Sequence, residues 1–512
     1  MKSNLFKYIF IVFVICILVF SFYKIKNDEK KGNQTQSEVN EQEKIKVKEI
    51  NLGIAEFDTL NPILSTNKNV QDIDLTTEYK AQPCLAKEWA KQTEKSYIIK
   101  LREDVKWSDG SKFTSEDVRF TIDKLKEIQS IYTNNVQDVI GVDIIDEFTI
   151  KINLSKEVAF FEYNLIFPIV SKNNYTNETV PIGTGKYKIN SITESNIILE
   201  QNSNWSNRTH IQLSLEKIRI NKYGSLGEMY NAFKIGNIDL VSSSNENLQE
   251  YIGKIGYSGK QLEGREHIFL ALNTQNKLLS QLSVRKAILH SIDKENIISS
   301  IFNNKYYISN FPLEYGTWIY QGQNSSIGYN PEQGKQILSD NKWIYKNKYW
   351  QKYENYKTQK LVLNILVKGN DNTKVAVAEN IKAQLENQGI GVNIINASDN
   401  QYINSLNTRN YDIALCSIYM SPSPNMDTFF GENNIAGYNN AEANEIMKEV
   451  KNTTDENIQK KDYQKLSEIY KNDVPYISLY TKKYIVAYNS SLAGEITPNW
   501  FNSFYKIETW SK

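Results

Sequence analysis

The sequence predicts a mixed α/β protein built from several domains, and three observations lead to that prediction. Residues 148–154 alternate apolar and polar side chains, as a strand with one buried face does. Residues 361–367 alternate in the same way, residues 375–385 repeat apolar side chains at helical spacing, and residues 390–395 resume a strand. This order predicts a β–α–β unit with parallel strands. The length of 512 residues corresponds to roughly two to four domains.

Local signals place further elements along the chain. An alternating stretch at 97–101 predicts a strand, and Gly110 closes a turn that begins at Trp107. Thr114 followed by Asp117 is an acidic variant of the capping box and predicts that a helix begins there. Further helices are expected at 284–290, 295–302 and 442–451, and a further strand at 411–418.

Composition and motif content exclude several classes of function. Lysine and arginine total 60 against 59 aspartate and glutamate, so the net charge of +1 gives no electrostatic drive toward nucleic acid. Three cysteines and three histidines, all far apart in the sequence, exclude a disulfide framework and a histidine-rich metal centre. The sequence has no HExxH, GxSxG or Walker A motif. We therefore expect neither an enzyme nor a metal or cofactor site, and we expect Cys84 and Cys416 to be buried thiols.

The N-terminus predicts a membrane anchor. Residues 8–20 are an unbroken apolar run, and residues 5–23 would form a helix of about 28 Å, close to the thickness of a hydrocarbon core. No small-x-small cleavage site follows the run, which favours an uncleaved transmembrane helix at residues 1–23 over a cleaved signal peptide. Cys16 raises a lipoprotein as a further alternative, although the residue before it is a large isoleucine. Residues 24–45 mix both charge signs with polar side chains, which is typical of a linker.

A series of short motifs follows one order along the chain. The most specific is the block LREDVKWSDG at 101–110, followed by TSEDV at 114–118. The others are FDTLNP at 57–62, LAKEW at 85–89, GTGKY at 183–187, GNID at 236–239, LN at 272–273, VRKA at 284–287 and IDK at 292–294. Together they resemble the extracytoplasmic solute-binding proteins of the oligopeptide, dipeptide and nickel ABC-importer class. The resemblance runs from about Asn51 to the C-terminus.

The resemblance implies a bilobed, periplasmic-binding-protein-like α/β fold whose first lobe carries an inserted subdomain. The boundaries that it implies are 46–70, 180–265 and 482–512 for lobe one, 71–179 for the inserted subdomain and 266–481 for lobe two. It also implies that the large domain lies outside the cytoplasm, tethered by the N-terminal transmembrane helix. A monomer would then bind a peptide or another small solute between the lobes and deliver it to an ABC permease with its ATPase.

Two features set the sequence apart from the peptide-binding members of that class. Those members carry an aspartate after a strand of the second lobe, where it pairs with the α-amine of the ligand, and the matching position here is the neutral Ser421. Asp427, six residues further on, is the candidate substitute. The stretch between Asn61 and Leu85 is also shorter than the pattern. Peptides are the expected solutes, and a metal chelate or an oligosaccharide is the alternative solute. The alternative to transport is a non-transport receptor on the same fold.

The first group of ligand-binding candidates follows the strand predicted at 411–418. Tyr419 and Ser421 lie at its carboxyl end, where open α/β sheets bind ligands, and Asp427 follows them in the chain. Trp107 and Asp109 belong to the most specific motif, yet a turn explains them, so we expect them to hold the fold.

The second group of candidates comes from elsewhere in the chain. Arg265 and His267 precede a strand at the expected crossover between the lobes. Asn273 can donate and accept hydrogen bonds, as recognition of a peptide backbone requires. The remaining candidates are Asn61, which belongs to the opening motif, and Trp318, whose ring can stack on a ligand.

Overall fold

The computed structural model describes residues 48–55, 59–64, 79–175, 180–206, 213–243, 248–313, 316–323, 327–354, 356–499 and 502–512. The predicted anchor and linker lie outside these residues, and so do Phe57 and Asp58 of the opening motif and residues 65–78 of the short stretch that follows it. In the described part of the chain, no helix combines the length and the apolar character that a membrane crossing requires.

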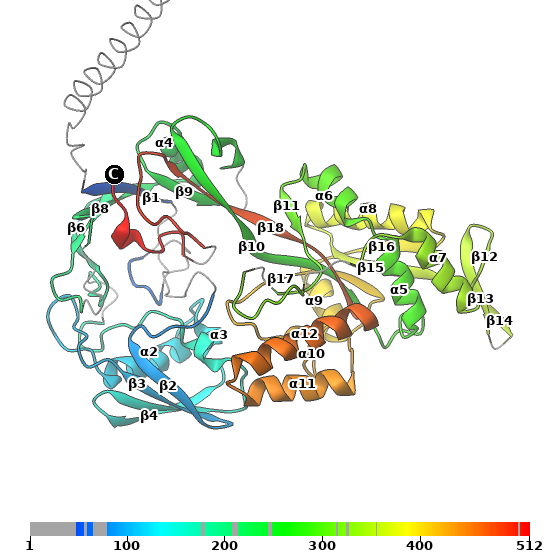
Figure 1. Ribbon diagram of the computed structural model, residues 1–512, viewed down its shortest axis with the longest axis horizontal. Helices are drawn as coiled ribbons and strands as arrows, with labels where there is room; N and C mark the ends of the chain where they lie inside the picture. Colours follow the sequence, from blue (N-terminus) through cyan, green and yellow to red (C-terminus); the bar gives the residue numbers. More distant parts are fainter. Residues whose placement is uncertain are drawn as a thin grey trace, which may run out of the picture.

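Of the four β-sheets among the described residues, three organise the fold, and the fourth is the small three-stranded sheet β12–β13–β14 (Figure 1). The first sheet has four strands in the order β1–β8–β7–β6, and its strands β1 and β8 run parallel. Helix α4 packs on this sheet and begins at Ser225, whose side chain accepts a hydrogen bond from the Glu228 N–H. We call these elements the first-sheet region: β1 (Glu49–Ala55), β6 (Tyr187–Ile192), β7 (Asn196–Gln201), β8 (Lys217–Tyr223) and α4 (Leu226–Lys234).

The second sheet is antiparallel, with the order β2–β3–β5–β4. It confirms the strands predicted at 97–101 and 148–154. Gly110 has a φ of +90°, as the predicted turn requires, and the Thr114 N–H donates to Asp117 Oδ2 at 3.0 Å at the predicted helix start. We call these elements the second-sheet region: β2 (Ala86–Thr93), β3 (Ser96–Leu101), α2 (Ser115–Glu127), α3 (Thr133–Val136), β4 (Val139–Asp146), β5 (Thr149–Leu154) and the 3-10 helix η2 (Phe161–Leu165).

The large sheet has seven strands and contains the predicted β–α–β unit. Strands β15 and β16 are parallel, α8 connects them, and Gly389 ends the helix with a φ of +81°. The sheet is nevertheless mixed, because β10 and β18 run antiparallel to each other and β10 runs antiparallel to β17. Its strands are β9 (Leu240–Ser243), β10 (Tyr257–Leu272), β11 (Tyr306–Ile308), β15 (Val362–Lys368), β16 (Gly391–Ala397), β17 (Ile413–Tyr419) and β18 (Tyr476–Asn489).

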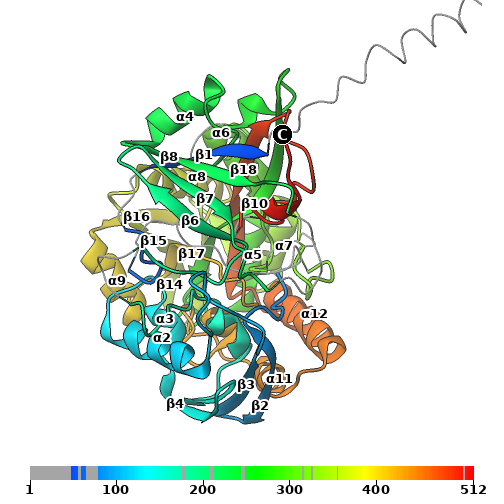
Figure 2. The same ribbon diagram turned by 90° about the vertical axis from the view of Figure 1, so that its left-hand side faces the viewer.

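Helices cover both faces of the large sheet, and the three helices predicted after residue 280 are confirmed as α5, α6 and α11 (Figures 1 and 2). We call the large sheet from residue 266 to residue 481, with its helices, the large-sheet region. Its helices are α5 (Leu282–Ser291), α6 (Lys294–Phe302), α7 (Pro331–Asp340), α8 (Asn372–Asn387), α9 (Asp399–Asn407), α10 (Asp427–Phe430), α11 (Ala441–Asn452) and α12 (Glu456–Asp473). The small elements are the hairpin strands β12 (Ile344–Lys346), β13 (Tyr349–Glu354) and β14 (Lys357–Lys360), and the 3-10 helices η3 (Leu248–Tyr251) and η4 (Ile507–Thr509).

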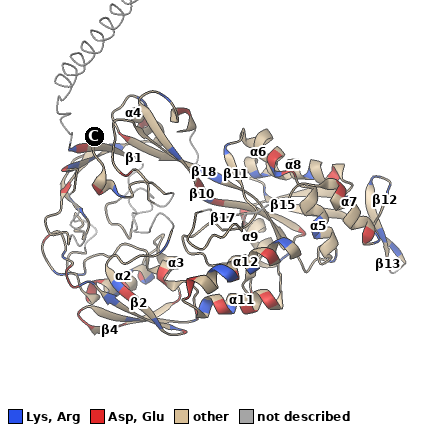
Figure 3. Cartoon of the chain, in the orientation of Figure 1, with Lys and Arg blue, Asp and Glu red and all other residues tan. Residues whose placement is uncertain are grey.

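Two long strands join the first-sheet region to the large-sheet region (Figure 1). The first part of β10 pairs only with β18, whereas its second part also pairs with β17. The β10–β18 register shifts between Glu263 and His267, which marks an irregularity at the point where the strands pass from one region to the other. Acidic and basic residues are interspersed along all three regions, α11 and α12 included (Figure 3).

Candidate solute-binding site

A cavity of ≈ 520 Å³ lies between the second-sheet region and the large-sheet region. The large-sheet region lines it with the segment 418–429 and with Pro312, Leu313 and Thr317. Three predicted ligand-binding residues, Tyr419, Ser421 and Asp427, therefore border one cavity. The opposite wall comes from the second-sheet region: Asn134, Gln137, Asp138, Lys156, Glu157, Val158 and Asn164.

The segment from Tyr419 to Asp427 emerges from the buried part of β17. Residues 413–416 are buried, whereas Tyr419 exposes 64% of its surface. Pro422 and Pro424 prevent the strand from continuing, since proline has no N–H to donate to a ladder. The turn is fixed by a hydrogen bond from the Ser423 N–H to Ser421 Oγ at 3.2 Å. The strand end thus presents this loop to the cavity.

Each carboxylate at the cavity faces a lysine. Asp427 Oδ1 is buried, receives no hydrogen bond within the described residues, and lies 3.2 Å from Lys451 Nζ. Asp138 pairs with Lys156 at 3.2 Å, and Glu157 pairs with a further lysine at 2.6 Å. The cavity therefore offers both acidic and basic groups, which suits a zwitterionic ligand better than a singly charged one.

Arg265 supports this loop from the neighbouring strand. Its Nε donates to the Met420 carbonyl at 3.2 Å, and the Met420 N–H donates to the Arg265 carbonyl at 2.8 Å. Arg265 therefore positions the segment that carries Tyr419 and Ser421. It lies within β10 rather than before a strand, and it is not among the described lining residues of the cavity.

His267 lies in the core beneath the loop. Its side chain is fully buried, its Nε2 lies 3.2 Å from Ser478 Oγ, and its ring stacks on Phe269. Burial, assisted by the positive charge of Lys294, lowers the pKa of His267 to about 3, so the ring is neutral at physiological pH. The structure therefore does not bring His267 into the cavity.

Two other candidates already use their side-chain amides in hydrogen bonds within the protein. Asn273 is buried, and its Nδ2 donates to the carbonyls of Arg409 and Tyr411 at 3.0 and 2.8 Å. Asn61 is buried in a turn, where its Oδ1 accepts a hydrogen bond from the Ile63 N–H at 3.2 Å. Neither residue lines the cavity, and their amides satisfy backbone groups.

Trp318 lies next to the cavity wall and connects two regions. Its Nε1 donates to Tyr163 Oη of the second-sheet region at 2.8 Å, and its ring lies edge-on to Phe160 at 6.4 Å. Thr317, the preceding residue, lines the cavity, whereas Trp318 itself does not. The indole therefore contributes to packing between the regions.

The expected fold residues behave as predicted, with one exception among the cysteines. Trp107 is buried, and Asp109 accepts hydrogen bonds from the N–H and the hydroxyl of Ser111 at 2.9 and 2.6 Å. Cys416 is buried, and burial raises its pKa to about 11. The prediction for Cys84 was wrong, because this thiol is exposed in the segment that precedes β2.

No sequence motif marks the cavity wall that the second-sheet region supplies. Asp138 and Glu157 meet Asp427 only because two parts of the chain more than 250 residues apart dock together. Neither carboxylate belongs to a motif, and surface carboxylates are common in this sequence.

Comparison with known proteins identifies a family whose match spans most of this chain. The family described as bacterial extracellular solute-binding proteins, family 5 (middle region), matches residues 80–440, well over half of the chain. This chain belongs to family 5. It is therefore a solute-binding protein of the ABC-importer class, a family that acts outside the cytoplasm.

Individual relatives can be aligned with this family 5 protein over most of its length. The oligopeptide-binding protein AppA of Bacillus subtilis is 22% identical over 456 residues, covering 81% of this chain and 80% of AppA. The structure of the nickel ABC transporter protein of Bacillus halodurans gives a TM-score of 0.74 at 19% identity and covers 88% of this chain and 98% of the other. The unliganded open form of the murein tripeptide-binding protein MppA gives 0.75 at 18% identity, with 91% and 98% covered. These structures show the bilobed periplasmic-binding-protein-like fold.

Proposed function

We propose that this family 5 protein is the membrane-tethered receptor of an ABC importer and that peptides are its solutes. The observation that carries the proposal is the cavity where Tyr419, Ser421 and Asp427 meet the second-sheet region. Its volume of ≈ 520 Å³ lies within the range of roughly 300–1,000 Å³ that is usual for small-ligand sites. Oligopeptide-binding relatives that cover most of the chain support the choice of solute.

The charges of the cavity match the two ends of a short peptide. Asp427 is the acidic group of the β17 loop, and its partly exposed carboxylate can accept the α-amine in place of, or beside, Lys451. Lys156, which is mostly exposed, can take the α-carboxylate from the opposite wall. Backbone groups of the loop after β17 can pair with the main chain of the peptide, as an added strand does. Neutral Ser421 leaves the recognition of the amine to Asp427.

The proposal includes closure of two lobes. Lobe one would comprise residues 46–70, 180–265 and 482–512, lobe two would comprise 266–481, and residues 71–179 would form the inserted subdomain. The strands β10 and β18 would bend where their register shifts, near Gly264. Residues 1–23 would tether the protein to the membrane, and 24–45 would act as the linker to the large domain.

Native mass spectrometry of the full-length protein, purified in mild detergent, tests the proposal. We expect a mixture of bound short peptides, identified by sequencing after mild unfolding. An empty protein that also shows no thermal shift with a peptide pool would contradict peptide binding. A co-purified metal chelate or oligosaccharide would keep the importer assignment and replace the solute, whereas an empty protein without any solute would favour a non-transport receptor.

The role of Asp427 is tested by the variant Asp427→Asn. Removing one partner of a charge pair at an interface costs roughly 2–5 kcal/mol when the pair is buried, and Asp427 is 43% exposed, so we expect a loss of about tenfold in peptide affinity. Asp399→Asn is the matched control, because Asp399 also begins a helix, pairs with a lysine at 3.3 Å and is 53% exposed, yet lies outside the cavity. Ser421→Asp should strengthen binding of the same peptides. Equal affinities for the Asp427→Asn and Asp399→Asn variants would reject the assignment of Asp427.

A further inference from the structure

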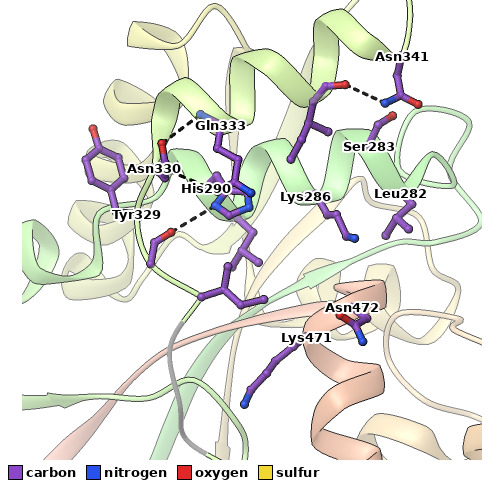
Figure 4. A pocket seen from close by; sticks show the side chains of 14 residues that line it. Leu282, Ser283, Lys286, His290, Tyr329, Asn330, Gln333, Asn341, Lys471 and Asn472 are labelled. Atoms are coloured by element: carbon purple, nitrogen blue, oxygen red, sulfur yellow. Dashed lines mark hydrogen bonds between the residues drawn. The ribbon is translucent and has the colours of Figure 1, made fainter.

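The strands β12, β13 and β14, which we call the hairpin sheet, project from the end of the large-sheet region beyond α7 (Figure 1). Asn341 caps α7 just before β12, and its Nδ2 donates to the Ile337 carbonyl at 2.8 Å (Figure 4). Trp343 and Trp350 are buried, and Trp350 Nε1 donates to the carbonyl of Gln388, at the end of α8, at 2.7 Å. These contacts fix the hairpin sheet to the helices beside it.

Positive charge is concentrated in the hairpin sheet. Residues 342–360 contain six lysines and one acidic residue, Glu354, which gives a net charge of +5 (six minus one) in a chain whose total is +1. Glu354 already pairs with Lys352 at 3.0 Å. The other five lysines are exposed and have no ion pair among the described residues: Lys342, Lys346, Lys348, Lys357 and Lys360. The hairpin sheet therefore offers uncompensated positive charge to its surroundings.

The strand register divides the side chains of the hairpin sheet between two faces. Residues that pair directly in antiparallel strands share a face, and neighbours along a strand alternate. Trp350 and Glu354 belong to one face, which the buried indole turns toward the end of α8. On the opposite face, which we call the outer face, the exposed residues are Ile344, Lys346, Tyr353, Thr358 and Lys360. The described residues of the outer face include no carboxylate.

Large apolar side chains stand among these lysines. Ile344 is 67% exposed and Tyr353 is 68% exposed, both on the outer face, and Tyr356, between β13 and β14, is 93% exposed. Lysines on edge strands commonly prevent pairing with other chains, which accounts for Lys346 on β12 but not for the exposed isoleucine and tyrosines. Apolar and tyrosine side chains interspersed with lysines are typical of surfaces that lie in the headgroup layer of a membrane.

We propose that the outer face of the hairpin sheet docks on an anionic lipid surface. Lys346 and Lys360 would lie at the lipid phosphates, and Ile344 and Tyr353 would enter the headgroup layer. Each lysine close to such a surface strengthens binding about fivefold. A dissolved polyanion matches the lysines equally well but gives the two apolar side chains no apolar surroundings. The exposed isoleucine and tyrosine therefore favour a lipid surface as the partner.

The position of the hairpin sheet gives this docking a consequence for orientation. The hairpin sheet and β1, which follows the proposed anchor and linker in the chain, lie at opposite ends of the longest axis (Figure 1). Anchor and hairpin sheet together would hold the large domain lengthwise along the membrane. This orientation rests on the tether of the proposed function, whereas docking of the hairpin sheet does not.

Acetylation of lysines in the full-length protein, measured for each residue by mass spectrometry, tests the docking. The protein is mixed with excess vesicles of phosphatidylcholine, with or without phosphatidylglycerol, and detergent is removed at constant ionic strength. We expect phosphatidylglycerol to slow the acetylation of Lys346 and Lys360 about fivefold or more relative to Lys448 and Lys461, which are exposed on α11 and α12. Flotation with the neutral vesicles reports the proposed tether separately, because these vesicles carry no net charge.

Variants separate the charge of the hairpin sheet from its apolar side chains. Lys348→Ser combined with Lys360→Ser should reduce the protection of Lys346 about fivefold or more. The matched control, Lys448→Ser combined with Lys461→Ser, removes the same charge outside the hairpin sheet and should leave this protection intact.

Ile344→Ser combined with Tyr353→Ser keeps every lysine and should also reduce the protection of Lys346, because the apolar contribution is lost. Equal acetylation rates with both kinds of vesicle would overturn the proposal. Protection by dissolved polyphosphate without protection by anionic vesicles would overturn it in favour of an anionic polymer, and so would protection that the Ile344→Ser and Tyr353→Ser protein retains in full.

Discussion

The large-sheet region joins the rest of the protein in two ways that differ in kind. It is joined to the first-sheet region by the continuous strands β10 and β18, with a register shift between Glu263 and His267. Among the described residues, it is joined to the second-sheet region through side-chain contacts, chiefly those of Phe160 and Tyr163 on one side and Trp318 and Tyr463 on the other. Backbone strands form the join to the first-sheet region, which we call the strand join. Packed aromatic side chains form the join to the second-sheet region, which we call the aromatic join.

This difference indicates where motion is least costly. Bending two strands at an irregularity keeps most backbone hydrogen bonds and exposes little apolar surface. Separating the aromatic join would expose Phe160 and Tyr163, which are now 6% and 5% exposed, at a cost of roughly 1.5–3 kcal/mol for each large apolar side chain. We therefore expect closure on a ligand to bend β10 and β18 while the second-sheet region, although its sequence is inserted within lobe one, stays docked on α12 and moves with the large-sheet region.

The largest expected effect comes from truncating the aromatic join. Phe160→Ala removes a buried ring that packs edge-on against Trp318 and Tyr463, which should lower the free energy of unfolding by about 3–5 kcal/mol. Urea denaturation measures the change. Phe160 has a φ of +54°, so Phe160→Gly should be less destabilising than its loss of contacts alone predicts, because glycine adopts this conformation without strain. Phe120→Ala, on α2 away from the join, is the control, and equal losses for Phe120→Ala and Phe160→Ala would mean that the join is not special.

Acid should weaken the strand join next. The pKa of His267, on β10, is about 3 in the folded protein and about 6.5 in an unfolded chain. Above pH 6.5 the ring is neutral in both states; as pH falls from 6.5 toward 3, only the unfolded state gains the proton, so the free energy of unfolding falls. By pH 4 the loss should reach about 3 kcal/mol. His267→Gln should flatten this part of the stability–pH curve, and identical slopes for both proteins would contradict the assignment.

A methyl group at Gly264 should have a moderate effect on the same join. A Cβ there would lie 2.5 Å from the Lys482 carbonyl oxygen, so the backbone of β10 and β18 must shift. We expect Gly264→Ala to cost about 1–3 kcal/mol and to alter ligand-induced closure, measured by small-angle scattering with and without a peptide pool. Gly141→Ala is the matched control, because Gly141 also lies in a strand but its added Cβ meets no atom within 4 Å. A Gly264→Ala protein with unchanged stability and closure would place the bend elsewhere.

The helices and strands could be predicted from the sequence better than the contacts between the regions, for a physical reason. Thr114 with Asp117, and the alternating stretch before Gly389, specify structure through neighbours in the chain, so a helix start and a β–α–β unit could be predicted from them. Phe160 and Trp318 meet only in the folded protein, and neither shows a pattern that indicates the other. The two joins therefore had to come from the structure.

The residues proposed for the site differ in the same way, because some could be predicted from local sequence and others could not. The end of a strand is a local feature, so Tyr419 could be placed at a ligand-facing position, although ligand binding by this residue stays a prediction. His267 and Asn273 are polar residues at the two ends of a continuously buried stretch, 268–272, where alternation gives no information about which face is covered. Their partners, Ser478 and the carbonyl of Tyr411, are more than 130 residues away in the chain. Sequence reasoning therefore had no means of finding that His267 is buried in the core and that the Asn273 amide is already hydrogen-bonded.

The smallest expected effect concerns the one hydrogen bond that joins Trp318 to Tyr163. Trp318→Phe and Tyr163→Phe each remove other contacts as well, since Tyr163 Oη also donates to the Tyr79 carbonyl and accepts from the Ala81 N–H. A double-mutant cycle isolates the interaction free energy between the two side chains. It should be about 0.5–1.5 kcal/mol, as for a typical intramolecular hydrogen bond. If the aromatic join stays closed during ligand binding, this coupling should be the same with and without a peptide pool. A coupling that disappears when ligand is added would instead show that the second-sheet region separates from the large-sheet region as the cleft closes, and the strand join would lose its role as the favoured place of bending.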